Sequence, residues 1–272
     1  MSVVERPIGV FDSGLGGLTV VRALIDLLPD EDVVYFGDTG RFPYGPKPRD
    51  EVVKYSIEIA DLLVDRGVKS IVVACNSAAA AALDVLRDRY DVPALGVVEP
   101  GLRAAASVTR TGRVGVIGTV GTIASGAYQL ASERLADSGR PIELTCAACP
   151  GFVEFVEAGD VDSDQVHVLA ERLLAPVRQA AVDTLVLGCT HYPLLARTIA
   201  DVMGRDVVLV SSADETAFEV RALLEARGVL RPFTGRRGIH RFVTSGEGKT
   251  FARLGSRFLG PEVCEVESWQ WT

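Results

Sequence analysis

The chain has 272 residues, a formal net charge of −8, 48% hydrophobic residues and 7% aromatic residues. That length fits one large domain or two small ones, the composition is typical of an α/β protein, and the acidic balance argues against a broad nucleic-acid-binding surface. No secretory signal or apolar stretch of the roughly 18 residues that span a bilayer is seen, so we expect a cytoplasmic protein with no membrane partner, whose five cysteines stay reduced.

The first part of the chain alternates short apolar runs with longer amphipathic segments. This pattern predicts strands at 7–11, 32–36, 70–74 and 94–98, and helices at 18–28, 50–66 and 77–89. Two loops rich in glycine or proline, 12–17 and 37–48, interrupt the regular segments. Strands that alternate with helices indicate a parallel sheet covered by helices on both faces.

The pattern then restarts. It predicts strands at 113–117, 142–147, 184–187 and 207–211, helices at 128–136, 166–180 and 214–227, a loop at 118–126, and a β-like tail. The two parts resemble degenerate copies, which would give pseudo-twofold symmetry and a cleft between two α/β domains. The tail has no counterpart in the second copy, so we expect it to pack on the first domain. The predicted domains are therefore 1–98 plus 212–272, and 99–211.

Two cysteines occupy matching positions, 114 residues apart. Cys75 lies in VVACNS and Cys189 in LVLGCTHYP, each directly after an apolar run that reads as a buried parallel strand. Open α/β sheets bind ligands at the carboxyl ends of their strands, and a following helix N-terminus offers backbone donors to a thiol. Two thiols facing one pocket could remove a proton from one face of a carbon and return one to the other. The alternative for each is an inert core cysteine.

Further candidate groups lie near these cysteines. His191 follows Cys189 by two residues and could be its proton partner, or it could make only a structural hydrogen bond. Asp12, followed by Ser13, opens the loop DSGLGG and could equally be a helix cap.

Two carboxylates and a cysteine pair leave further alternatives. Glu154 and Glu157 follow the predicted strand end near Cys149. Each could belong to the site or could be an ordinary surface carboxylate. Cys146 and Cys149 form a CxxC pair, but no second pair stands at zinc-ligand spacing, which leaves a redox role as its alternative. DSGLGG suits an anion but does not match the dinucleotide fingerprint.

At these residues the chain resembles the glutamate racemases, of the cofactor-independent aspartate/glutamate racemase superfamily. The resemblance rests on IGVFDSGLGGLTV, YFGDTGRFPYG, VACNSA, GVVEP, GVIGTVGT, CPGFVEFVE and LGCTHYPLL. It implies two flavodoxin-like domains with the active site between them. It also implies interconversion of L- and D-glutamate without pyridoxal phosphate, metal or nucleotide, with D-glutamate supplied to peptidoglycan synthesis.

The resemblance also assigns roles to residues. Cys75 would act on the D enantiomer with help from Asp12, and Cys189 on the L enantiomer with help from His191. The residues implied to hold the substrate's carboxylates and amine are Asp12, Ser13, Tyr44, Gly45, Asn76, Ser77, Thr190 and His191. Ser77 replaces the family's usual threonine, and FVEFVE replaces FVPLVE, which places the expected active-site carboxylate at Glu157 and leaves Glu154 as the alternative.

Three other functions stay open from the sequence. An aspartate racemase is the nearest enzyme, and a non-catalytic ligand-binding protein is the alternative of a different class. Because some glutamate racemases inhibit DNA gyrase, binding to gyrase is the third, although nothing in the sequence locates such a surface. A homodimer is the oligomer we consider.

Overall fold

The structure is a computed structural model that describes residues 2–263 and 265–271, so Cys264 lies outside the described residues. The chain divides into two compact units, Met1–Val97 with Ala213–Thr272, and Val98–Ser212. Within the described residues, no helix combines the length and apolar character that crossing a membrane requires.

The first unit is built on a six-stranded sheet with the order β10-β9-β2-β1-β3-β4, in which every pairing is parallel. Its central strands are continuous buried runs, as expected for strands covered on both faces. Its elements are η1 (Val3–Glu5), β1 (Ile8–Asp12), α1 (Leu18–Leu27), β2 (Val33–Gly37), α2 (Arg49–Asp65), β3 (Ser70–Val73), α3 (Asn76–Arg89), β4 (Ala94–Gly96), α11 (Ala213–Ala226), β9 (His240–Thr244), α12 (Gly248–Leu259) and β10 (Val266–Ser268).

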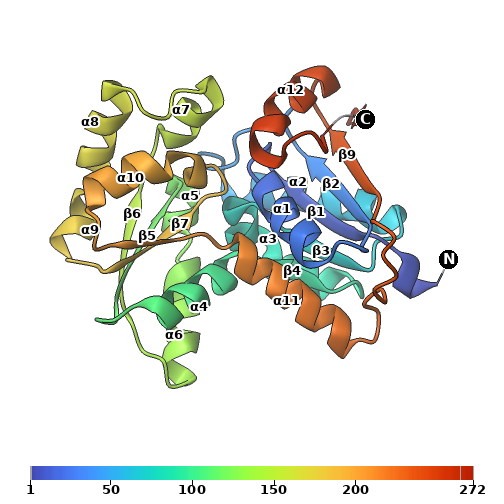
Figure 1. Cartoon of the computed structure of the whole chain (residues 1–272), viewed down its shortest axis with the longest axis horizontal. Helices are drawn as coiled ribbons and strands as arrows, with labels where there is room; N and C mark the ends of the chain where they lie inside the picture. The colour runs from blue at the N-terminus through green and yellow to red at the C-terminus, as the bar shows by residue number, and fades with distance from the viewer. Residues whose placement is uncertain (1, 264, 272) are drawn as a thin grey trace. The chain divides into compact units, whose positions relative to one another are not determined.

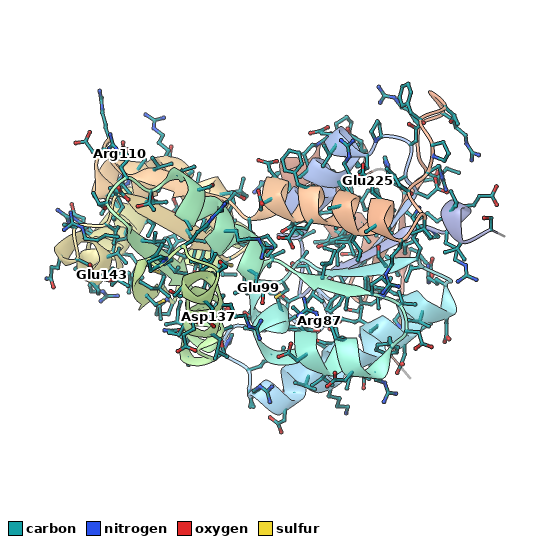
Figure 2. The ribbon with its side chains drawn as sticks, turned by 90° about the horizontal axis from the view of Figure 1, so that it is seen from below. Arg87, Glu99, Arg110, Asp137, Glu143 and Glu225 are labelled. Carbon is teal, nitrogen blue, oxygen red and sulfur yellow. The ribbon has the colours of Figure 1, made fainter. Side chains whose placement is uncertain are left out.

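Helix packing in this unit follows the apolar faces of the helices. α1 packs against α11 and α12, while α2 packs against α3 (Figure 1). Arg87 of α3 also donates from Nε to the Ala94 carbonyl of β4 at 3.1 Å, which ties α3 to the edge strand (Figure 2). The contact fixes the last turn of α3 at the beginning of β4.

The second unit is built on a four-stranded parallel sheet with the order β6-β5-β7-β8. α4 packs on α6 and on β7, and α8 packs on α10. Its elements are α4 (Val98–Val108), β5 (Arg113–Gly118), α5 (Val120–Ala124), α6 (Ala127–Asp137), β6 (Glu143–Ala148), α7 (Phe152–Ala158), α8 (Asp164–Leu173), α9 (Ala175–Gln179), β7 (Thr184–Gly188), η2 (Tyr192–Leu195), α10 (Ala196–Met203) and β8 (Val208–Val210).

The two sheets share one topology. In the first, the opening strand β1 lies between β2 and β3, with β4 beyond β3; in the second, β5 lies between β6 and β7, with β8 beyond β7. Each sheet therefore has a switch point, between β1 and β3 or between β5 and β7, where the chain's direction of winding reverses. Ligands bind at such points in open α/β sheets. The predicted α/β class with parallel sheets is confirmed.

Several predicted elements are wrong in detail. The strand predicted at 94–98 ends at Gly96, and Val98 instead begins α4, whose first turn holds Glu99 and Pro100. The helix predicted at 166–180 is two helices, α8 and α9, separated before Pro176.

The loops and the tail differ as well. The loop predicted at 118–126 contains α5, capped by Thr119. The tail is more than β-like, because it includes α12 between β9 and β10, the two strands that extend the first sheet.

Candidate active site

The first cluster of predicted site residues lies at the carboxyl edge of the first sheet. Cys75 caps α3 directly after β3, and Asp12 ends the neighbouring strand β1. The backbone N–H of Ala74 donates to the Phe11 carbonyl at 2.9 Å, which carries the pairing of the two strands up to this edge. The first cluster comprises Asp12, Ser13, Tyr44, Gly45, Cys75, Asn76 and Ser77, all buried.

Asp12 does not cap a helix. α1 begins six residues later, at Leu18, with Gly17 as its N-cap residue, and Asp12 is fully buried. Its Oδ2 accepts a hydrogen bond from the Gly14 N–H at 3.0 Å, and Tyr35 donates its hydroxyl to the Gly14 carbonyl at 2.9 Å. These contacts fix the DSGLGG loop around the carboxylate. Of the two readings of Asp12, the structure therefore removes the helix cap.

Gly17 is the residue that lets Asp12 pack in this position. A Cβ on Gly17 would lie 2.6 Å from the Asp12 Cβ and 3.0 Å from the Ala74 Cβ. We expect Gly17→Ala to displace Asp12 and to cost about 1–3 kcal/mol, the usual penalty of overpacking. Thermal unfolding measures this loss, and Gly67→Ala, where a Cβ meets nothing within 4 Å but φ is +73°, serves as a control for backbone strain alone. An unchanged melting temperature in Gly17→Ala would contradict the packing role.

The Cys75 thiol is held neutral by its surroundings. It is 5% exposed, and it donates to Ser13 Oγ at 3.6 Å. Burial, with the Asp12 charge as the second cause, raises the pKa of Cys75 to about 12, against the lowering effect of hydrogen bonds from Ala78 and Ser13. At neutral pH this thiol is therefore protonated. It can act as a base only after another group has taken its proton.

This raised pKa predicts the alkylation behaviour of Cys75. Alkylation by iodoacetamide requires the thiolate, so its rate at Cys75 should climb as pH rises from neutrality toward about 12. Asp12→Asn removes one raising cause and leaves burial, so the rate near pH 8 should rise about three- to tenfold. Peptide mass spectrometry gives the rate at each cysteine, with Cys146 as the internal control. Slower alkylation of Cys75 in Asp12→Asn than in the wild type would show that the Asp12 charge does not raise the pKa of this thiol.

The loop after β2 carries Tyr44 and Gly45. As predicted, the residues after Gly37 form no helix or strand up to α2. The Tyr44 hydroxyl donates to Asp38 Oδ2 and its ring is buried, so Tyr44 and Gly45 can offer a ligand mainly their backbone. Asp38, which sequence reasoning did not single out, is fully buried and organises this loop. Its only sequence signal is an aspartate after a buried strand in YFGDTG.

The second cluster comprises Glu157, Cys189, Thr190 and His191. Cys189 follows β7 and is 7% exposed, and His191 is 2% exposed. Cys189 is followed by the short 3₁₀ turn η2 rather than directly by an α-helix, which corrects the predicted helix N-terminus there. His191 Nε2 lies 2.8 Å from Glu157 Oε1, whereas Glu154 on the same helix α7 is exposed. The carboxylate that contacts the histidine is therefore Glu157.

The two cysteines of the CxxC motif lie beside the second cluster and form no disulfide. Cys146 and Cys149 are free thiols, and burial raises their pKa values to about 11 and about 12. Cys149 is buried, and its carbonyl accepts from the Tyr192 hydroxyl at 3.1 Å, so it supports the turn after Cys189. In the part of the chain that the structure describes, no three His, Cys, Asp or Glu residues are grouped to hold a metal ion.

Residues 8–219 match the family described as Asp/Glu/Hydantoin racemase. The chain therefore belongs to this family of racemases, and it is an isomerase that acts on an amino acid.

Its similarity is narrower than the family. A glutamate racemase of Acidothermus cellulolyticus is 53% identical over 96% of this chain and 97% of its own length. A solved glutamate racemase of Bacillus anthracis matches 98% of this chain and 97% of its own with a TM-score of 0.90 and 40% identity. A solved glutamate racemase of Francisella tularensis, in complex with D-glutamate, matches 98% of each chain with a TM-score of 0.89 and 34% identity. Within the family, the chain belongs to the glutamate racemases.

Proposed function

We propose that the chain interconverts L- and D-glutamate by a two-base proton transfer at Cα, with Cys75 and Cys189 acting on opposite faces of that carbon. The observation that carries the proposal is that the two cysteines follow equivalent strands, β3 and β7, of two sheets with one topology. We assign each of them a proton partner. Asp12 accompanies Cys75, and the His191–Glu157 pair accompanies Cys189.

The proton inventory explains why each thiol needs a partner. In the L-to-D direction, Cys189 takes the α-proton, the electron pair stays on Cα and the substrate carboxylate, and Cys75 gives its proton to the other face. The thiols have then exchanged protonation states. Asp12 and His191 reset them by passing protons to and from solvent, since a thiol with a pKa near 12 does not release its proton unaided.

The carbanion-like state is stabilised by hydrogen bonds rather than by an electron sink. Buried residues with polar side chains or polar backbone groups lie in the two clusters, and we assign the substrate's carboxylates and amine to them: Asp12, Ser13, the backbone of Tyr44 and Gly45, Asn76, Ser77, Thr190 and His191. In a buried, water-poor setting such donors stabilise developing charge more strongly than water does. No cofactor, metal or nucleotide takes part in the proposed steps.

The test is circular dichroism of L- or D-glutamate incubated with the purified protein and no added cofactor, with exchange of the α-hydrogen in D₂O as a second readout. Loss of optical activity from either enantiomer is expected. A non-catalytic binding protein would show no exchange. Faster turnover of aspartate than of glutamate would favour the aspartate racemase alternative.

The remaining assignments follow from this activity. D-glutamate would serve peptidoglycan synthesis, and the substrate is a small molecule. A cytoplasmic location, a homodimer and binding to DNA gyrase stay predictions. Fractionation, light scattering and a supercoiling assay with added protein test them in turn.

A further inference from the structure

Asp38 lies where three segments of the first unit meet. Its carboxylate accepts from Arg41 Nε at 2.7 Å, from the Tyr44 hydroxyl, from Ser245 Oγ at 2.6 Å and from Trp271 Nε1 at 3.2 Å. Arg41 and Tyr44 belong to the loop after β2, Ser245 follows β9, and Trp271 follows β10. The segment after β10 therefore shares one buried carboxylate with the loop that carries Tyr44 and Gly45.

Trp271 does more than donate one hydrogen bond. Its ring lies 5.4 Å from the Phe36 ring, centroid to centroid, and the Arg41 guanidinium stacks over it at 3.9 Å. Arg41 is also paired through its Nη1 with Glu58 of α2. The indole thus covers the ion pair between Arg41 and Asp38, and shielding from water strengthens that pair.

We propose that Trp271 is a positioning residue for the proposed racemase reaction: through Asp38 and Arg41 it holds the 37–48 loop so that Tyr44 and Gly45 present their backbone to the substrate. This inference rests on the proposed function. Trp271 is linked to this loop by its hydrogen bond to Asp38 and by its stacking on Arg41, and neither of these residues is assigned to the substrate. Its effect therefore falls on substrate binding rather than on proton transfer.

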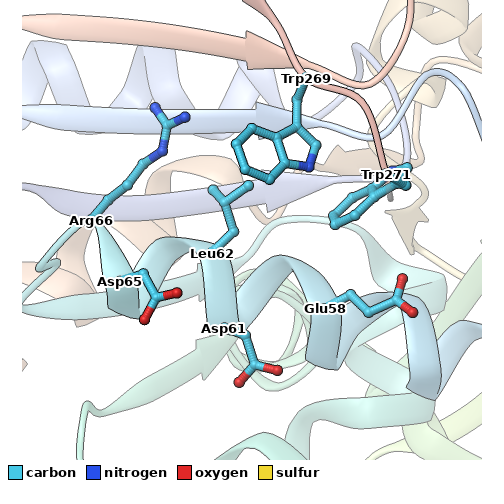
Figure 3. Close-up of a pocket in the computed structure, with 7 residues that line it drawn as sticks. All are labelled: Glu58, Asp61, Leu62, Asp65, Arg66, Trp269 and Trp271. Carbon is cyan, nitrogen blue, oxygen red and sulfur yellow. The ribbon is translucent and has the colours of Figure 1, made fainter.

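A neighbouring pocket makes this contact accessible to a small molecule. Trp271, Trp269, Leu62 and Glu58 are among the residues that line a pocket of about 510 Å³. Figure 3 shows the two indoles over α2, with Leu62 pointing toward them. A planar aromatic molecule with an N–H donor could therefore occupy the space left by a truncated Trp271 and restore the hydrogen bond to Asp38.

The experiment compares Trp271→Ala and Trp271→Phe with Trp269→Phe as the matched control. Trp269 Nε1 is buried with no hydrogen-bond partner among the described residues, so removing this N–H in Trp269→Phe should change KM little. We expect Trp271→Ala to raise KM for glutamate about tenfold with kcat within about twofold, and Trp271→Phe to give an intermediate KM because the ring contacts remain.

Rescue and hydrogen exchange complete the test. Indole should lower the KM of Trp271→Ala toward the wild-type value, whereas benzofuran, which lacks the N–H, should do so less. Amide exchange of Gly40, which donates to Ser245 Oγ at 2.9 Å, should accelerate in Trp271→Ala and slow again with indole.

Two results would overturn the inference. One is an unchanged KM together with unchanged loop exchange in Trp271→Ala. The other is an equal loss of kcat and melting temperature that neither phenylalanine nor indole relieves. The exchange readout does not depend on turnover, and an inactive wild-type protein would count against the proposed function instead.

Discussion

Replacing Cys75 or Cys189 by alanine is expected to lower the turnover of glutamate by about 10⁴-fold in both directions while leaving the fold intact. The two enantiomers have equal free energies in water, so a variant cannot lose kcat/KM in one direction only. Both thiols are buried, but each is a small side chain, and alanine removes one sulfur without adding volume. Circular dichroism in the far ultraviolet and the melting temperature check the fold.

The two variants should still differ in isotope exchange. Cys75→Ala keeps the base that is proposed to face L-glutamate, so in D₂O it should exchange the α-hydrogen of the L enantiomer without inverting it. Cys189→Ala should do the same with D-glutamate. Nuclear magnetic resonance follows the α-hydrogen, and chiral chromatography shows whether inversion accompanies exchange.

Cys146→Ala is the control, because Cys146 lies on β6 outside both clusters. Near-normal turnover in either Cys75→Ala or Cys189→Ala would refute the two-base assignment. Exchange of the wrong enantiomer would keep the two bases and reverse their assignment to the faces.

The sequence predicts the sheets better than the connections. Buried strands such as β1, β3 and β7 are read correctly because runs of valine, isoleucine and leucine with no polar interruption have few other uses in a chain of this length. The same preference explains why the predicted strand extends wrongly to Val98: β-branched residues favour a strand, but here the acidic first turn and the packing of α4 on α6 and β7 favour a helix.

The candidate site divides in the same way. Cys75, Asp12 and Cys189 stand at strand ends, so the sequence can locate them at the carboxyl edges of their sheets. The contact between His191 and Glu157 joins residues 34 positions apart on separate elements, and spacing cannot choose between Glu154 and Glu157. The link from Trp271 to Asp38 spans 233 positions and exists only because β9 and β10 extend the first sheet.

Glu157→Gln is expected to lower kcat/KM about 100-fold in both directions, whereas Glu154→Gln should stay within about twofold of the wild type. The Glu157 carboxylate accepts from His191 Nε2 and so fixes the ring's tautomer and orientation, which an amide can no longer guarantee. Glu154 is exposed on the same helix, so it is a control matched in chemistry and in element.

Deuterium isotope effects reveal which proton transfer the Glu157→Gln change slows. With glutamate deuterated at Cα, the isotope crosses at Cys189 when L-glutamate is the substrate and at Cys75 when D-glutamate is. If His191 serves Cys189, the step at Cys189 becomes more rate-limiting in Glu157→Gln. The isotope effect should then grow with L-glutamate and shrink with D-glutamate. The opposite pattern would show that the His191–Glu157 pair assists Cys75 instead. Equal losses of kcat/KM in Glu154→Gln and Glu157→Gln would show that the contact between Glu157 and His191 has no specific role.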